Sequence, residues 1–163
     1  MITREQFIDA VIASCAEIFE MVLPLKLSNR MNERPLPYNF QTASIKTDIL
    51  AILGLTGHCS GLIQLSLPYD LSLKLAGWMM QETYNELNSE VFESIGELLN
   101  LIAGGLKNRL SSQELDIFEI SIPFVISGQD KSVYHGTDKE YIFIPIDTDQ
   151  GLFFITLVLD QNK

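Results

Sequence analysis

Residues 89–110 read SEVFESIGELLNLIAGGLKNRL, and their apolar side chains recur at the spacing of a single long helix. At about 100° per residue, the apolar side chains share one broad face and the polar side chains gather on the opposite face. The apolar set comprises Val91, Phe92, Ile95, Leu98, Leu99, Ile102, Ala103, Leu106 and Leu110. A face of this kind must be buried against other elements. The stretch therefore predicts a helix, capped by Ser89 and reaching about Leu110, around which the fold packs.

The segments on both sides of this helix follow helical and strand patterns in turn. Thr3 and Gln6 form a capping box that begins a helix ending before Pro24, and a loop with Pro35 and Pro37 follows. A second, shorter helix is expected from about Asp70 to Met80. The expected strands are Ile45–Leu55, Gly61–Leu67, Ile117–Ile126, Tyr141–Ile146 and Leu152–Leu159. Short turns join the first two strands, and also the last two, into hairpins.

The order of helix, strands and hairpin occurs twice along the chain. Phe7 in the first helix corresponds to Phe92 in the long helix, and Gly61 after the first hairpin turn corresponds to Gly151 after the last one. This layout predicts a divergent internal repeat. Because 163 residues suffice for one core, we expect a single domain over residues 1–163. Its fold class is α+β, with a pseudo-twofold repeat of helix plus antiparallel strands and long helices packed on an antiparallel β-sheet.

The charge of the chain bears on its partners. The formal net charge is -10 and the isoelectric point is near 4.5. Nucleic-acid binding depends on lysine and arginine displacing condensed counterions, so we expect no nucleic-acid partner, and no anionic membrane. No uncharged run approaches the roughly 18 residues that a membrane span needs. The polar first residues lack the apolar centre of a signal peptide, so we expect a cytoplasmic protein.

The cysteines and histidines bear on disulfides and metals. Cys15 lies in an apolar helical stripe and Cys59 lies beside a turn, and two such thiols in a reducing compartment predict no disulfide. His58 and His135 are the two histidines, and no spacing typical of zinc ligands occurs. We therefore expect no metal site in this chain, and a bound metal would have to come with a partner.

The polar face of the long helix holds the candidate functional residues. Glu93, Glu97, Asn100, Gly104 and Asn108 fall within a narrow stripe. Glu97 and Asn100 lie one turn apart, so both side chains can reach one ligand. A short Glu-x-x-Asn pattern is also what the solvated side of an amphipathic helix provides by chance. The pair taken alone therefore does not separate a site from a plain surface.

Glycines make this helix unusual. Gly96, Gly104 and Gly105 lie inside it, and each costs about 0.5–1 kcal/mol relative to alanine. Gly104 falls on the polar face near Asn100, where a missing side chain would let another backbone approach. The alternative is that the glycines allow close packing within the protein itself. Docking and packing remain equally open on this ground.

These residues carry a family resemblance. IGELLNLIAG at residues 95–104, followed by Pro123 in the next strand, is similar to the signature of the CheC/CheX/FliY chemotaxis phosphatases. The likeness extends to GLTG at 54–57, GLI at 61–63 and VISG at 125–128. The first helix has no Glu-x-x-Asn around Ala13, so the chain resembles the CheX-like members, with one site. The resemblance implies a CheC/CheX-like fold. Glu93 departs from the Ser or Asp often found four residues before the motif Glu.

The resemblance implies an enzyme that hydrolyses the phospho-aspartate of a CheY-like response regulator. Asn100 would position the attacking water, because phosphoryl transfer relies on positioning and charge stabilisation. Glu97 would anchor the partner's lysine. Glu93, Gly96, Gly104 and Pro123 are expected around the docking surface, with Pro123 shaping the adjoining strand. No cofactor of its own is implied, since Mg²⁺ comes with the phosphorylated receiver.

The resemblance also implies a homodimer formed by joining sheet edges, to which the apolar strand Leu152–Leu159 would contribute if it lies at an edge. Two other functions stay open. One is a non-catalytic receiver-binding or flagellar-switch-like scaffold, since fold alone does not imply catalysis. The other is a small-ligand sensor, suggested by Phe143, Phe153 and Phe154, although aromatic residues at alternating strand positions are typical of a core.

Overall fold

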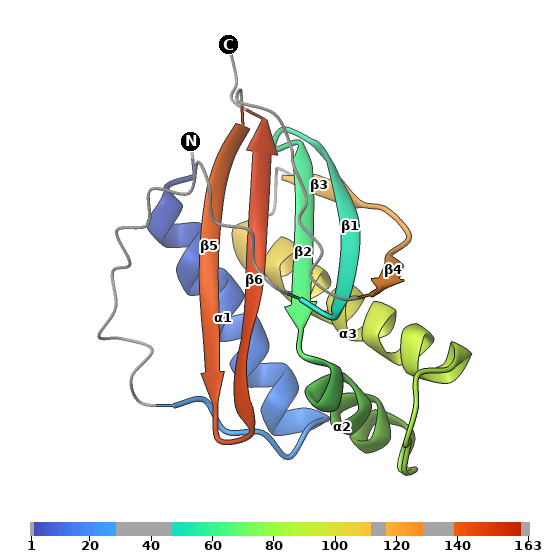
Figure 1. The fold of residues 1–163 in the computed structure, drawn as a ribbon. Coiled ribbons are helices and arrows are strands. Elements are labelled where there is room, and N and C mark those ends of the chain that lie inside the picture. The colour runs from blue at the N-terminus through green and yellow to red at the C-terminus, as the bar shows by residue number, and fades with distance from the viewer. Residues whose placement is uncertain (1, 29–46, 112–116, 129–138, 161–163) are drawn as a thin grey trace.

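The structure is a computed structural model, and it describes residues 2–28, 47–111, 117–128 and 139–160. Within these ranges three helices pack on a six-stranded antiparallel sheet (Figure 1). In chain order the elements are α1 (Arg4–Met21), β1 (Ile49–Gly57), β2 (Gly61–Leu67), α2 (Tyr69–Met80), α3 (Ser89–Leu110), β3 (Phe118–Ile120), β4 (Phe124–Ser127), β5 (Lys139–Thr148) and β6 (Gly151–Asp160). The predicted α+β class is confirmed.

The sheet has the symmetry that the internal repeat predicts. Its strand order is β3-β1-β2-β6-β5, and β4 pairs with β1 beyond the end of β3. The hairpins β1–β2 and β5–β6 therefore meet through their second strands, β2 and β6, which pair antiparallel. Gly61 begins β2 and Gly151 begins β6, and both have positive φ angles, of 152° and 134°. The two glycines thus occupy equivalent positions, at the start of the second strand of each hairpin.

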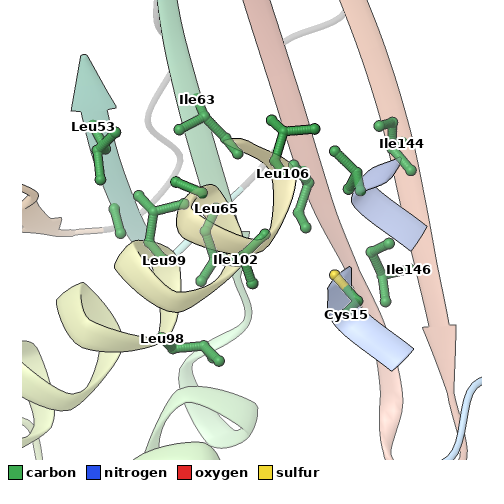
Figure 2. Close-up of a cluster of buried hydrophobic side chains, with 14 of the residues drawn as sticks. Cys15, Leu53, Ile63, Leu65, Leu98, Leu99, Ile102, Leu106, Ile144 and Ile146 are labelled. Atoms are coloured by element: carbon green, nitrogen blue, oxygen red, sulfur yellow. The ribbon is translucent and has the colours of Figure 1, made fainter. Parts of the chain in front are cut away.

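Helices α1 and α3 cover one face of this sheet. α1 lies behind β5 and β6, and α3 lies behind β1 and β2 (Figure 1). Leu99 and Ile102 of α3 lie next to Leu65 of β2, and Cys15 of α1 lies next to Ile146 of β5 (Figure 2). All five side chains are fully buried, and burial raises the pKa of the Cys15 thiol to about 12. No helix in the described ranges is long and apolar enough to cross a membrane.

The two long helices begin at side-chain caps. Thr3 and Gln6 form the predicted capping box of α1, with Thr3 Oγ1 accepting from the Gln6 amide at 3.2 Å. The prediction that Ser89 caps α3 is wrong by one residue. Asn88 is the cap, because its Oδ1 accepts a hydrogen bond from the Val91 amide at 3.0 Å, and Ser89 is the first residue of the helix.

The expected strand Ile117–Ile126 is divided in two. β3 and β4 are separated by residues 121–123, where Pro123 has no amide to donate to the sheet. At this break the Ser121 hydroxyl accepts a hydrogen bond from the Gly54 amide at 2.8 Å, and the Ser121 amide donates to the Gly54 carbonyl at 2.9 Å. The break is therefore held against β1 by both the side chain and the backbone of Ser121.

The remaining strands differ from expectation mainly at their ends. Both strands of the last hairpin are longer than expected and form a ten-residue ladder. β6 lies between β2 and β5, so Leu152–Leu159 does not meet the condition of lying at a sheet edge, under which it would contribute to a dimer. The reason is the pairing of the two hairpins through their second strands. The loop with Pro35 and Pro37, the start of the expected strand at Ile45, and His135 lie outside the described residues.

Gly61 is the glycine on which this pairing depends most. A Cβ added there would lie 2.0 Å from the Val158 carbonyl oxygen, whereas one added at Gly151 would meet nothing within 4 Å. Both glycines have positive φ, so alanine at either position is strained by about 1–2 kcal/mol. We expect Gly61→Ala to lower the free energy of unfolding well beyond the loss for Gly151→Ala, as measured by urea denaturation. Equal losses would show that the β2–β6 contact relaxes without cost.

Candidate active site

The sequence-predicted pair lies on the outward face of α3. Glu97 is exposed, Asn100 is half-buried, and the Asn100 amide nitrogen donates to Glu97 Oε2 at 3.4 Å. Glu93 is exposed one turn before Glu97. Ile95, which lies between Glu93 and Glu97 in the sequence, is fully buried, and so are Leu98 and Leu99 before Asn100. The helix period therefore separates a packed face from an accessible face, and the pair belongs to the accessible one.

α3 is held by its neighbours on both sides. On the α1 side, Arg109 forms an ion pair with Glu17 and also donates to Ser14 Oγ at 3.4 Å. On the other side, the Lys107 ammonium lies 3.0 Å from Glu119 Oε1 in β3. Nothing in the sequence marks Lys107 or Arg109, because their partners are 12 and 92 residues away in the chain. These contacts fix the orientation of the helix face that carries Asn100.

The three glycines of α3 have different surroundings. A Cβ at Gly105 would lie 2.8 Å from Ser14 Oγ, so this glycine allows the close approach of α1. A Cβ at Gly96 would lie 3.6 Å from Pro123 Cγ, so Gly96 lies under the β3–β4 break. A Cβ at Gly104 would meet nothing within 4 Å. Two of the glycines thus serve packing, and Gly104 leaves open space beside Asn100.

Pro123 lies at one border of the polar stripe. It is half-buried and packs on α3 next to Gly96, the residue before Glu97. Val125 packs there too, with its Cγ2 3.7 Å from the Cβ position of Gly96. The structure therefore brings together Glu93, Gly96, Glu97, Asn100, Gly104 and Pro123, which are the residues singled out in the sequence. Gly96 and Pro123 form the wall of the site rather than its open surface.

The electrostatic character of the surface is set by carboxylates. Glu93 and Glu97 are exposed on the stripe, and Glu90 accepts a hydrogen bond from the Tyr84 hydroxyl at 3.0 Å. Desolvation and the neighbouring Glu90 both raise the pKa of Tyr84.

The described parts of the chain contain no group of three His, Cys, Asp or Glu residues placed to hold a metal ion. What these residues offer a ligand is one carboxamide and one carboxylate side by side.

Comparisons with known proteins find relatives of this chain. The family model of the chemotaxis phosphatase CheX matches residues 49–147. The CheY-P phosphatase CheX of Thermotoga maritima is 27% identical over 129 residues, which are 78% of this chain and 79% of that protein. The matched stretch includes all of α2, α3 and the β3–β4 break.

Solved structures show the same fold. The crystal structure of a chemotaxis protein CheX from Desulfovibrio desulfuricans has a TM-score of 0.80 and 21% identity, covering 94% of this chain and 99% of that chain. A CheX-CheY-BeF3-Mg²⁺ complex from Borrelia burgdorferi has a TM-score of 0.69 and 19% identity, covering 96% of this chain and 97% of that chain. The family model covers more than half of the chain and includes the Glu97–Asn100 helix, so the chain belongs to the chemotaxis phosphatase CheX family.

Proposed function

We propose that this protein hydrolyses the phospho-aspartate of a CheY-like response regulator, and that it does so with Asn100 and Glu97. The observation that carries the proposal is the Asn100–Glu97 pair, which lies on the outward face of a rigidly packed helix within the region that the family model matches. The relatives named a CheY-P phosphatase and a CheX-CheY complex support the choice of substrate. The proposed compartment is the cytoplasm.

We assign to Asn100 the role of positioning the attacking water. Its carboxamide oxygen accepts a hydrogen bond and its amide group donates two, so it can hold a water in line with phosphorus. The water oxygen forms a bond to phosphorus while the bond to the aspartyl oxygen breaks. Inorganic phosphate leaves and the aspartate carboxylate is restored. This chemistry needs no nucleophilic side chain from the phosphatase, and the receiver supplies Mg²⁺ with its own acidic residues.

Glu97 serves as an anchor in this proposal. An ionised carboxylate is purely an acceptor, and its charge-assisted bond to a lysine ammonium is stronger than a bond between neutral groups. In the free protein Glu97 accepts from Asn100 at a long 3.4 Å, so the carboxylate can turn to a partner at little cost. A partner lysine bound there would set the position of Asn100 relative to the phosphoryl group.

The surroundings of the pair fit a docking surface. Gly104 leaves open space one turn beyond Asn100, where a backbone of the partner could lie against α3. Gly96 and Pro123 shape the border of this surface through their mutual contact. Glu93 adds a second exposed carboxylate one turn before Glu97, which we expect to influence the choice of partner.

The two alternative functions have less support in the structure. A scaffold would have no need of a carboxamide and a carboxylate adjoining on an open helix face. The aromatic residues that suggested a ligand sensor pack on other groups: Phe153 is fully buried with its ring 6.1 Å from Phe19, and the rings of Phe143 and Phe154 stack at 4.8 Å. These contacts favour a packing role for the aromatics.

The principal test is the decay of a phosphorylated CheY-like receiver from the same cell. We expect wild-type protein to accelerate the decay and Asn100→Ala to lose about a hundredfold in kcat, equal to about 2.7 kcal/mol of barrier. The measurement is single-turnover release of inorganic phosphate.

Two variants separate the assigned roles. Glu97→Gln keeps the size of the side chain and removes its charge, so we expect a higher KM with a smaller effect on kcat. Asn100→Asp keeps the size and removes the amide donors, so we expect the loss to fall on kcat. A wild-type protein that leaves the decay of every receiver unchanged would favour the scaffold.

Gly104→Ala tests the open space beside Asn100. Because a Cβ would meet nothing there, the substitution should raise the free energy of unfolding by about 0.5–1 kcal/mol through helix propensity. If a partner backbone occupies the space, phosphatase activity should fall at least about tenfold through misplacement of the reacting groups. Full activity in the stabilised variant would show that no partner atom approaches Gly104.

We also propose a homodimer formed between sheet edges, as the family resemblance implies. In the described sheet the outermost positions belong to β5 at one end and to β3 and β4 at the other. Sedimentation equilibrium should give twice the chain mass of 18.4 kDa. A species of 18.4 kDa alone at micromolar concentration would reject the dimer.

A further inference from the structure

The surface beside the catalytic pair carries two exposed apolar side chains for which the polar chemistry has no use. Ile122, in the β3–β4 break, is 88% exposed, and Leu101 of α3 is 36% exposed. Single apolar residues on a surface are ordinary and need no explanation. These two differ in their position, because each lies next to a border of the Glu97–Asn100 stripe.

Leu101 is placed by the helix period. It follows Asn100 directly and lies four residues after Glu97, so its side chain neighbours Glu97 on the helix surface. On the helix circumference Asn100 lies between Gly96 on one side and Glu97 and Leu101 on the other. Leu101 therefore borders the stripe on the side away from Gly96.

Ile122 is placed at the opposite border. Pro123, the next residue, packs on Gly96 with its Cγ 3.6 Å from the Cβ position of that glycine. The backbone before Ile122 is fixed by the Ser121–Gly54 hydrogen bonds, and Ser121 Oγ also donates to the Ile122 carbonyl at 3.2 Å. The side chain is thus presented to solvent from a rigid backbone, so contact with a partner would order little besides the side chain itself.

We propose that Leu101 and Ile122 are apolar docking residues for the receiver domain, one on each side of the catalytic pair. The proposed partner is a CheY-like receiver that presents apolar surface around its phosphorylated aspartate. The inference rests on the proposed function and adds the contacts that hold the substrate protein in place. An ordinary interface covers about 800 Å² on each partner. A receiver seated on Asn100 therefore reaches both borders of a stripe one helix wide.

The charge of the surface bears on how a receiver could bind. The chain has a net charge of -10, and Glu93 and Glu97 are both exposed on the stripe. The substrate group is an acyl phosphate, which is an anion, so long-range attraction to this surface does not assist encounter. Exposed ion pairs contribute little to affinity. Burial of apolar area is a further source of binding free energy beside the Glu97 anchor, and Leu101 and Ile122 offer it next to the site.

The experiment measures binding and hydrolysis separately. Binding is measured by calorimetry with the CheY-like receiver held in its activated form by beryllofluoride and Mg²⁺, which cannot turn over. Hydrolysis is measured with the phosphorylated receiver. The variants are Leu101→Ala, Ile122→Ala and the double variant. The matched control is Leu152→Ala, which removes a 42% exposed leucine from β6 near the turn that adjoins residues 26–28.

We expect each single substitution to raise the Kd and the KM together by about three- to tenfold, and the double variant by more, through loss of buried apolar area. Leu152→Ala should leave both quantities at the wild-type value. Thermal unfolding followed by circular dichroism serves as the folding check. Because Ile122 is exposed, we expect Ile122→Ala to leave the unfolding temperature unchanged.

The outcomes distinguish the two proposals. Wild-type hydrolysis with unchanged Kd and KM in the double variant would overturn the docking role and leave the phosphatase standing. Binding that depends on Leu101 and Ile122 without hydrolysis would overturn the phosphatase and support the docking surface. Absence of both binding and hydrolysis in the wild type would overturn the two together.

Discussion

Burial of the inner face of α3 against β1 and β2 is the constraint on which the rest of the structure depends. Leu99, Ile102 and Leu106 are fully buried between the helix and the sheet. Each such side chain contributes about 1.5–3 kcal/mol when removed from water, so the helix cannot rotate about its axis without losing that free energy. A helix that cannot rotate presents a single stripe to solvent. Glu97 and Asn100 face outward because the residues on the opposite side of the helix are buried.

Close approach by small residues completes this arrangement. Gly105 admits Ser14 of α1, and Gly96 admits Pro123 of the β3–β4 break. The same helix is therefore clamped from both sides, and Arg109 and Lys107 extend the clamp through ion pairs to Glu17 and Glu119. The ion pairs are partly exposed and contribute little to stability. Their value lies in restricting the position of the helix, which suits the proposed role of Asn100 in positioning a water.

Much of this could be read from sequence because it follows from local rules. The period of residues 89–110 predicts both the helix and its polar stripe, and the capping box of α1 lies within four residues. The predictions that were wrong concern places where two neighbouring residues compete for one role or where one residue interrupts a pattern. Asn88 replaced Ser89 as the cap of α3, since the two adjoin and both types cap well. The strand through Pro123 was interrupted, because proline cannot donate to a ladder.

The sequence by itself determined most of the elements, the outward-facing Glu97–Asn100 pair and the family resemblance, since helical period and short-range hydrogen bonding depend on residues a few positions apart. Tertiary structure alone decided which glycine serves which purpose. It placed β6 between β2 and β5, and it brought Pro123 onto Gly96. It also left Ile122 exposed next to Pro123. These features depend on contacts between segments far apart in the chain, and such contacts are settled by the joint packing of the whole sheet and its helices.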